Sequence, residues 1–136
     1  MTRRVRTLAS LAAAVAALLA TLAYVDSAFD WESAIGLCNV PVASVTPDPN
    51  GTLSAVAFEV YCGPVPPSNT HVSLVPSGRT FSRKHSVDFL VLDGSYHLPI
   101  QWTEEATLEI GLPAQAKAFK RETRIEHVTV NYRPIL

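Results

Sequence analysis

The chain has 136 residues, 48% of them hydrophobic, and its eleven lysine and arginine residues against twelve aspartate and glutamate residues give a formal net charge of −1. A nucleic-acid-binding domain needs a concentrated basic face, so this balance argues against nucleic acid as a partner. Roughly the first thirty residues differ in composition from the rest, which leaves about a hundred residues, a common size, for one folded domain.

The N-terminal segment from residue 8 to residue 25 carries no charge and is built mainly of alanine and leucine, both strong helix formers. A helix of that length spans roughly 27 Å, close to the apolar thickness of a bilayer. Arg3, Arg4 and Arg6 precede it, which by the positive-inside rule places the N-terminus in the cytoplasm. We therefore predict an arginine cluster and a single-pass transmembrane anchor in the lipid bilayer over residues 1–30, a linker over 31–37, and a domain outside the cytoplasmic membrane over 38–136.

A cleaved signal peptide is the alternative to a retained anchor. Signal peptides have an apolar stretch of about 7–15 residues followed by a cleavage site of small residues. The apolar stretch here is longer, and the two candidate sites, Thr21-Leu22-Ala23 and Val25-Asp26-Ser27, match that pattern weakly. The sequence thus favours retention in the membrane over a secreted or periplasmic domain released by cleavage.

Cys38 and Cys62 are the two cysteines of the chain, and both lie in the part predicted to be exported. In an oxidising compartment two cysteines without a competitor most simply pair with each other. They are too far apart for a CxxC redox motif, and two thiolates alone leave a structural metal ion short of ligands. The pattern favours a structural disulfide; free, reactive or intermolecular cysteines are the alternatives.

The exported part reads as a series of short strands separated by turn residues. Residues 53–61 are apolar on both faces, as in a central strand, and the preceding Asn50-Gly51 is typical of a hairpin turn. Residues 114–119 fit one helical turn or a loop, and the change of phase at Glu126-His127 is typical of a β-bulge. The predicted strands cover residues 40–45, 53–61, 70–75, 87–92, 96–103, 107–112 and 121–132.

About seven short strands with regular turn signals predict a mainly β fold. The expected architecture is a small antiparallel sandwich or barrel-like meander, preceded by one N-terminal transmembrane helix. Phe58 and Trp102 occupy core-like positions within their strands.

The order of landmarks in the exported part resembles a widespread group of small bacterial envelope proteins of uncharacterised function. The landmarks are Cys38, Pro47-Asp48-Pro49-Asn50-Gly51, Ala55-Val56-Ala57-Phe58-Glu59, Cys62-Gly63, Asn69-Thr70-His71-Val72-Ser73-Leu74, Trp102 and Val128-Thr129-Val130-Asn131-Tyr132-Arg133. The resemblance covers nearly all of residues 38–133. It implies a β domain closed by a Cys38–Cys62 disulfide and brings no function with it.

The titratable residues form no recognisable catalytic or metal-binding pattern. His71, His85, His97 and His127 are far apart in the sequence and are interpreted as surface or strand-face residues. The chain has no phosphate-binding glycine loop and no nucleophile motif. We predict no catalytic residue, no cofactor and no metal site.

Arg79, Arg83, Lys84 and His85 form a small basic group in the middle of the chain. A solvated loop explains it most simply, and a site for an anionic lipid or polymer is the alternative. We identify these four residues as the candidate surface-interaction loop.

The function predicted from the sequence is that of a membrane-anchored envelope protein whose outer domain is a non-catalytic binding or scaffolding module. Its expected partner is another envelope protein or the membrane surface. The competing hypothesis is a small periplasmic or extracellular enzyme, or a ligand carrier, with a site that the sequence does not reveal.

Overall fold

The computed structural model describes residues 2–28, 38–63 and 68–136. The chain divides into two compact units, Met1–Ile35 and Gly36–Leu136, which are described separately. The predicted linker over residues 31–37 lies outside the described residues.

The first unit contains one α-helix, α1 (Thr2–Ala28), with the side chains of residues 10–25 exposed. Within the described part of the chain, no helix combines the length and the apolar character that crossing a membrane requires. Alanine, with a single methyl group, is the commonest residue of α1 and contributes little apolar surface. The transmembrane anchor predicted over residues 8–25 is therefore not supported.

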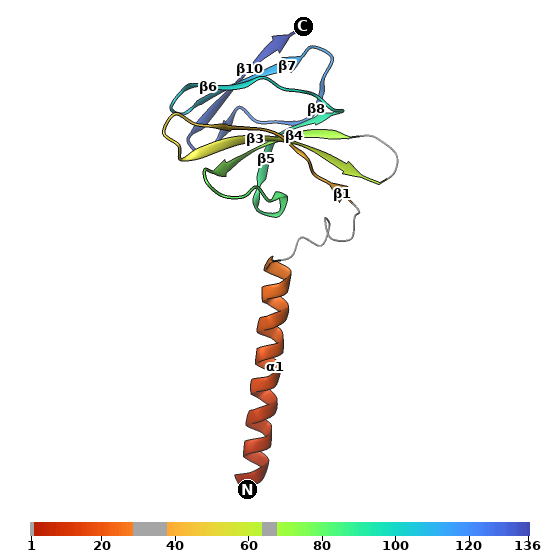
Figure 1. Cartoon of the computed structure of the whole chain (residues 1–136), viewed down its shortest axis with the longest axis vertical. Coiled ribbons are helices and arrows are strands. Elements are labelled where there is room, and N and C mark those ends of the chain that lie inside the picture. The colour runs from red at the N-terminus through yellow and green to blue at the C-terminus, as the bar shows by residue number, and fades with distance from the viewer. Residues whose placement is uncertain (1, 29–37, 64–67) are drawn as a thin grey trace. The chain divides into compact units, whose positions relative to one another are not determined.

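The second unit consists of two β-sheets (Figure 1). In the first sheet, β3 is flanked on one side by β4, β5 and β8 in that order and on the other by both β1 and β2. Its strands are β1 (Cys38–Asn39), β2 (Val42–Pro47), β3 (Leu53–Cys62), β4 (Asn69–Pro76), β5 (Val87–Asp93) and β8 (Lys117–Arg121).

The second sheet has the strand order β6-β7-β10-β9. Its pairs are antiparallel except for β7 and β10, which run parallel. The strands are β6 (Ile100–Glu104), β7 (Thr107–Pro113), β9 (Arg124–Ile125) and β10 (Val128–Ile135). One turn of 3-10 helix, η1 (Arg83–His85), lies between β4 and β5.

The main hydrophobic core lies between the two sheets, because buried side chains from both sheets contribute to one cluster. The first sheet supplies Ala55, Ala57, Val72, Phe89, Leu90 and Leu92, and the second supplies Leu108, Ile110, Val128 and Val130. The mainly β, antiparallel prediction is confirmed in the form of a sandwich. The sheets do not close into a barrel.

Strand β3 is buried on both faces, as predicted for a central strand. Ala55 and Ala57 face the core between the sheets, and Val56, Phe58 and Val60 form a second cluster on the opposite face. We call this second side the outer face of the first sheet. Alternate side chains of a strand point to opposite faces, so an apolar run on both faces requires a cover on each.

The predicted disulfide between Cys38 and Cys62 is confirmed. The two cysteines are directly opposed where β1 pairs with β3, with their Cα atoms 4.1 Å apart. The turn between β2 and β3 contains Gly51 at φ 69°, a conformation that glycine adopts readily. The Asp48 carboxylate closes it by accepting hydrogen bonds from the backbone amide and the hydroxyl of Thr52, each at 2.7 Å.

Three local predictions differ from the structure. Of residues 114–119, predicted as one helical turn or a loop, residues 114–116 connect β7 to β8, and residues 117–119 belong to edge strand β8. Glu126-His127 is a turn between β9 and β10 rather than a bulge, with Glu126 at φ 51°. The strand expected over residues 96–103 begins only at Ile100. The described residues thus contain ten strands, several of them short, instead of about seven.

Candidate functional site

The candidate site is the connection between β4 and β5, residues 77–86, which we call the β4–β5 loop. It lies on the side of the first sheet away from the second sheet (Figure 1). Its first residue is held to the β2–β3 turn and to the start of β3, because the Ser77 amide donates to the Thr52 carbonyl at 3.0 Å and the Ser77 hydroxyl lies 2.9 Å from that of Ser54. Backbone bonds from His85 to Ser82 and from Ser86 to Arg83 close the turn of η1.

Phe81 anchors the middle of the loop on the sheet. Its ring lies 4.6 Å from that of Phe58, between centroids, and packs on the outer-face cluster of Val56, Phe58, Val60 and Val75. Phe58 also stacks on the His71 ring at 5.2 Å. Burial of aromatic surface therefore fixes the loop in place.

A polar network of His71, Ser73 and Asp88 lies on β4 and β5 next to this cluster. The Asp88 carboxylate contacts His71 Nδ1 at 2.6 Å and accepts a hydrogen bond from the Ser73 hydroxyl at 2.5 Å. Burial of the carboxyl group is the largest influence on its pKa and raises it. The hydrogen bonds from His71 and Ser73, with the charges of His71 and Arg83, together outweigh burial and hold the pKa of Asp88 below its ordinary value of 3.8.

The network has the residue types of a serine hydrolase but not the arrangement. In a catalytic triad the histidine accepts the serine proton and the carboxylate orients the histidine. Here Ser73 donates to Asp88, and its side chain is fully buried at 0% exposure, out of reach of a substrate. His71, which the sequence placed on a surface or strand face, is also buried. The arrangement satisfies buried polar groups and ties β4 to β5.

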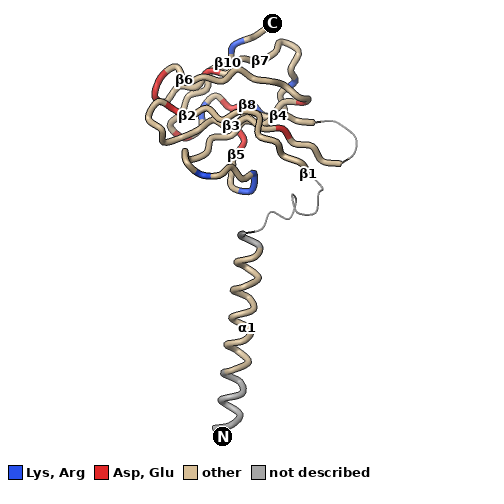
Figure 2. The backbone as a smooth tube through the Cα atoms, viewed as in Figure 1, with Lys and Arg blue, Asp and Glu red and all other residues tan. Residues whose placement is uncertain are grey.

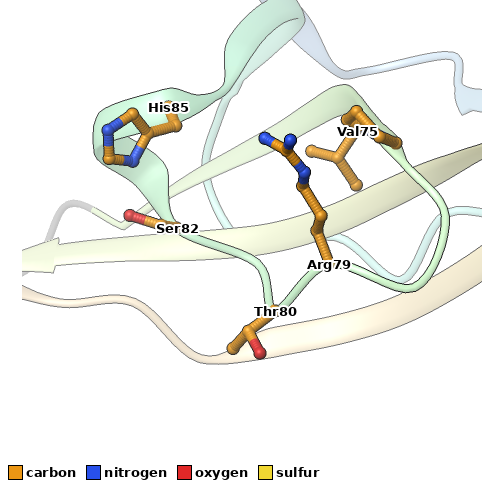
Figure 3. Close-up of a pocket in the computed structure, with 6 residues that line it drawn as sticks. Val75, Arg79, Thr80, Ser82 and His85 are labelled. Carbon is orange, nitrogen blue, oxygen red and sulfur yellow. The ribbon is translucent and has the colours of Figure 1, made fainter.

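A pocket of about 190 Å³ opens between the β4–β5 loop and the end of β4. Figure 3 shows the Arg79 side chain extending away from the loop backbone, with Val75 on one side of it and Ser82 and His85 on the other, and the Thr80 side chain pointing away. The lining residues are Val75, Pro76, Arg79, Thr80, Ser82 and His85. The pocket thus combines an apolar wall with groups that donate hydrogen bonds.

The structure brings the four predicted loop residues onto one short segment but gives them different surroundings. Arg79 and His85 line the pocket. Arg83 acts electrostatically on Asp88, and Lys84 is exposed. The basic residues of the loop lie together on the outer side of the first sheet (Figure 2). Ser82 and Thr80 were not identified from the sequence, because hydroxyl residues in a loop give no signal of their own.

The other histidines and carboxylates considered in the sequence do not join this site. His97 and His127 are exposed, and Glu104 and Glu105 lie exposed at the turn between β6 and β7. Among the described residues, no group of three or more histidine, cysteine, aspartate or glutamate side chains is placed to hold a metal ion.

An apolar strip borders the outer face at the edge of the sheet. Val42 and Val45 on β2 oppose Phe58 and Val56 on β3, and directly opposed residues share a face. Their side chains are 43% and 57% exposed. The first sheet therefore presents an exposed apolar edge and a basic loop on the same face.

Comparison with known proteins adds no relative. No protein-family model, curated protein or solved structure matches the chain. The resemblance to small envelope proteins stays a prediction from the sequence.

Proposed function

We propose that this chain is an exported protein whose β domain is a non-catalytic binding module, with the β4–β5 loop and the exposed edge of β2 as its contact surface. The Cys38–Cys62 disulfide indicates an oxidising environment outside the cytoplasm. The arginine-led helix α1 is proposed as the segment that directs export.

The observation that carries the binding role is the combination of features on the outer face. A loop is usually the most mobile part of a small domain. This loop is fastened to the sheet by Phe81 and to the β2–β3 turn by the Ser77 amide, its η1 turn is closed by its own backbone bonds, and it carries Arg79, Lys84 and His85 exposed. A cationic loop beside exposed Val42 and Val45 supports a partner with acidic groups around an apolar contact.

The alternative of a small enzyme would need a titratable pair that a substrate can reach. The closest histidine–carboxylate contact in the described residues is His71 with Asp88. Both residues belong to the network with Ser73, and the His71 and Ser73 side chains are buried. This burial supports the binding module over the enzyme.

Site-specific photocrosslinking in intact cells tests the binding module. A photoreactive residue in place of Lys84 or of Val45 should give a crosslinked product of defined mass. The same residue in place of Asn131, exposed on β10 of the other sheet, is the matched control and should give none. Equal yields from all three positions, or no product from Lys84 and Val45, would contradict the proposal.

The compartment is tested separately by alkylating intact cells without reductant. Outside the cytoplasm, Cys38 and Cys62 should resist alkylation until a reductant is added, and the domain should be accessible to protease added to spheroplasts. A retained N-terminus would leave the full-length mass in the membrane fraction, and a cleaved one a shorter mass. Two freely alkylated thiols in a protease-protected domain would rule out export.

A further inference from the structure

We propose that the pocket formed by Arg79, Ser82 and His85 binds the phosphate group of an anionic ligand. This inference deepens the proposed function, since it names the chemistry that the β4–β5 loop recognises. It assigns Arg79 as the main anion contact, with Ser82 and His85 as further hydrogen-bond donors.

The polar side chains of the pocket are not used by the rest of the fold. Within the described part of the chain, the side chains of Arg79, Thr80, Ser82 and His85 make no hydrogen bond and no ion pair. Elsewhere in the domain, Lys120 lies 3.2 Å from Glu122 and Arg133 lies 2.7 Å from Glu109. The donors of the pocket therefore remain available to a ligand.

The electrostatic balance around the pocket is positive. Residues 75–87 include two arginines and one lysine but no acidic residue. The nearest carboxylate along the chain, Asp88, is occupied by His71 and Ser73, and Arg83 contributes to its electrostatic environment. The negative charge of Asp88 is thus balanced by these groups, so the positive charge of Arg79 remains available to an anion.

The arrangement of donors suits a phosphate group better than a carboxylate. A guanidinium group presents a planar fork that can bind two oxygen atoms at once. Ser82 and His85 line the same pocket, so their donors are available to oxygen atoms that the fork does not hold. A tetrahedral phosphate has such further oxygen atoms, whereas the two oxygen atoms of a carboxylate are both taken by the fork.

The pocket is shaped before a ligand arrives. The turn that carries Arg79 is closed by its amide donating to the Pro76 carbonyl at 3.4 Å, and the η1 turn is closed by the His85 amide donating to the Ser82 carbonyl at 3.1 Å. Phe81, between Arg79 and Ser82, is fixed on Phe58. A preformed loop lowers the entropy cost of binding. The exposed side chains of Arg79 and His85 place the mouth of the pocket at the surface, so the rest of a larger ligand can stay outside.

The test is a titration of the full chain, in a neutral detergent, with inorganic phosphate, followed by amide chemical shifts. Sodium chloride at matched ionic strength is the blank. Saturable shifts are expected in residues 75–86. Loss of a charge-assisted contact should weaken phosphate binding about tenfold in Arg79→Gln, and Ser82→Ala should weaken it by a smaller factor.

Arg124→Gln is the matched control, because it removes the same charge from an exposed position on β9. Its affinity should equal that of the unchanged chain. Shifts that do not saturate, or an equal loss in Arg79→Gln and Arg124→Gln, would show that phosphate only screens surface charge and would overturn the site. Unchanged shifts of residues outside the loop confirm that each variant is folded.

Vesicles identify the source of the phosphate group. Phosphatidylcholine vesicles that contain phosphatidic acid should compete with inorganic phosphate if the ligand is a lipid headgroup, whereas pure phosphatidylcholine should not. Competition assigns a lipid headgroup, and phosphate binding without competition assigns a free phosphate. If Lys84 gives a crosslink but the chain does not bind phosphate, the phosphate site is refuted and the proposed binding module stands. If the chain binds phosphate but gives no crosslink, the phosphate site stands and the macromolecular partner is refuted.

Discussion

At the scale of single residues, the outer face of the first sheet depends on the ionised carboxylate of Asp88. It accepts from both His71 and Ser73, and the Lys120 ammonium group donates to its backbone carbonyl at 2.6 Å. A buried polar group is stabilising only when its partners are present, since each group left unpaired keeps the cost of leaving water. The three side chains should therefore behave as one unit in mutagenesis.

Asp88→Asn should lower the free energy of unfolding by about 1–3 kcal/mol at neutral pH, because the amide cannot accept both bonds as a charge does. The pKa of Asp88 is depressed in the folded state, so its stabilising effect is present above the unfolded-state value of 3.8 and is lost as pH falls through the lower folded-state value. Urea unfolding at neutral and acidic pH should show the difference between the two proteins shrinking in acid. Asp93→Asn is the control on the same strand, and a gap that stays constant below pH 3.8 would contradict this role.

Tyr132 gives a second residue-scale prediction, at the opposite end of the pH scale. Burial raises the pKa of its phenol to about 12 from an ordinary 10.0, and its hydroxyl donates to the Glu122 carbonyl at 2.6 Å. The protonated phenol therefore stabilises the fold at pH values below the unfolded-state pKa, and this stabilisation is lost as the pH rises toward the folded-state pKa. Unfolding should be measured from about pH 9 to about pH 12, on both sides of the ordinary tyrosine pKa. Over this range the unchanged chain should lose stability relative to the Tyr132→Phe variant. Parallel curves for the two proteins would count against it.

At the scale of elements, the β4–β5 loop is a cover for the outer face rather than a free connection. Val56, Phe58 and Val60 would otherwise expose the second face of β3. Phe81 supplies part of that cover, together with Val40, and it lies between Arg79 and Ser82 along the chain. Packing of the outer face and the position of the candidate binding site thus share one aromatic residue.

Phe81→Ala should lower the free energy of unfolding by about 1–3 kcal/mol, since Phe81 is only partly buried and a full core truncation costs more. Amide exchange should accelerate at Ser77, His85 and Ser86, whose amides make the loop's backbone bonds. Phe119→Ala is the matched control, because Phe119 is 57% exposed on β8 and its loss should change stability by less than about 0.5 kcal/mol. Similar losses in both variants would mean that Phe81 does not fasten the loop.

The elements that could be predicted from the sequence are those whose pattern follows from local geometry. The β7 strand alternates apolar Leu108 and Ile110 with more polar positions, and β3 is apolar on both faces, so both were identified. The β8 strand, Lys117–Arg121, is a mostly exposed edge strand with no buried side chain, and such a strand has no apolar alternation to detect. The parallel pairing of β7 with β10 is set by packing between distant segments.

Only part of the candidate site could be predicted from the sequence. The basic residues of the loop could be selected by composition, because charge clusters are visible in a sequence. The surroundings of His71 and Ser73 could not be predicted in this way, because His71 stacks on Phe58 and both residues contact Asp88, and these partners come from other parts of the chain. The pocket also needs Val75 and Pro76 as its apolar wall, and nothing in their local sequence marks them as lining residues.

At the scale of the whole molecule, the disulfide is the main attachment of the start of the β domain. The β1 strand has two residues and pairs with β3 only through Cys38 opposite Cys62 and Asn39 opposite Tyr61. The longer β2 pairs with β3 from Val42 onward and closes the sheet without the disulfide. Reduction should therefore release β1 first and leave the sandwich folded.

The double variant Cys38→Ser/Cys62→Ser should lose about 3 kcal/mol of unfolding free energy, the loop-closure value for a ring of this size. In hydrogen exchange the amides of Asn39 and Tyr61 should lose protection, whereas those of β4 and β7 should follow the global change in stability. The oxidised chain treated with reductant under native conditions is the control and should match the variant. A variant that unfolds completely would show that β1 and its disulfide hold the two sheets together, and one as stable as the oxidised chain would show that β2 alone fixes this edge of the domain.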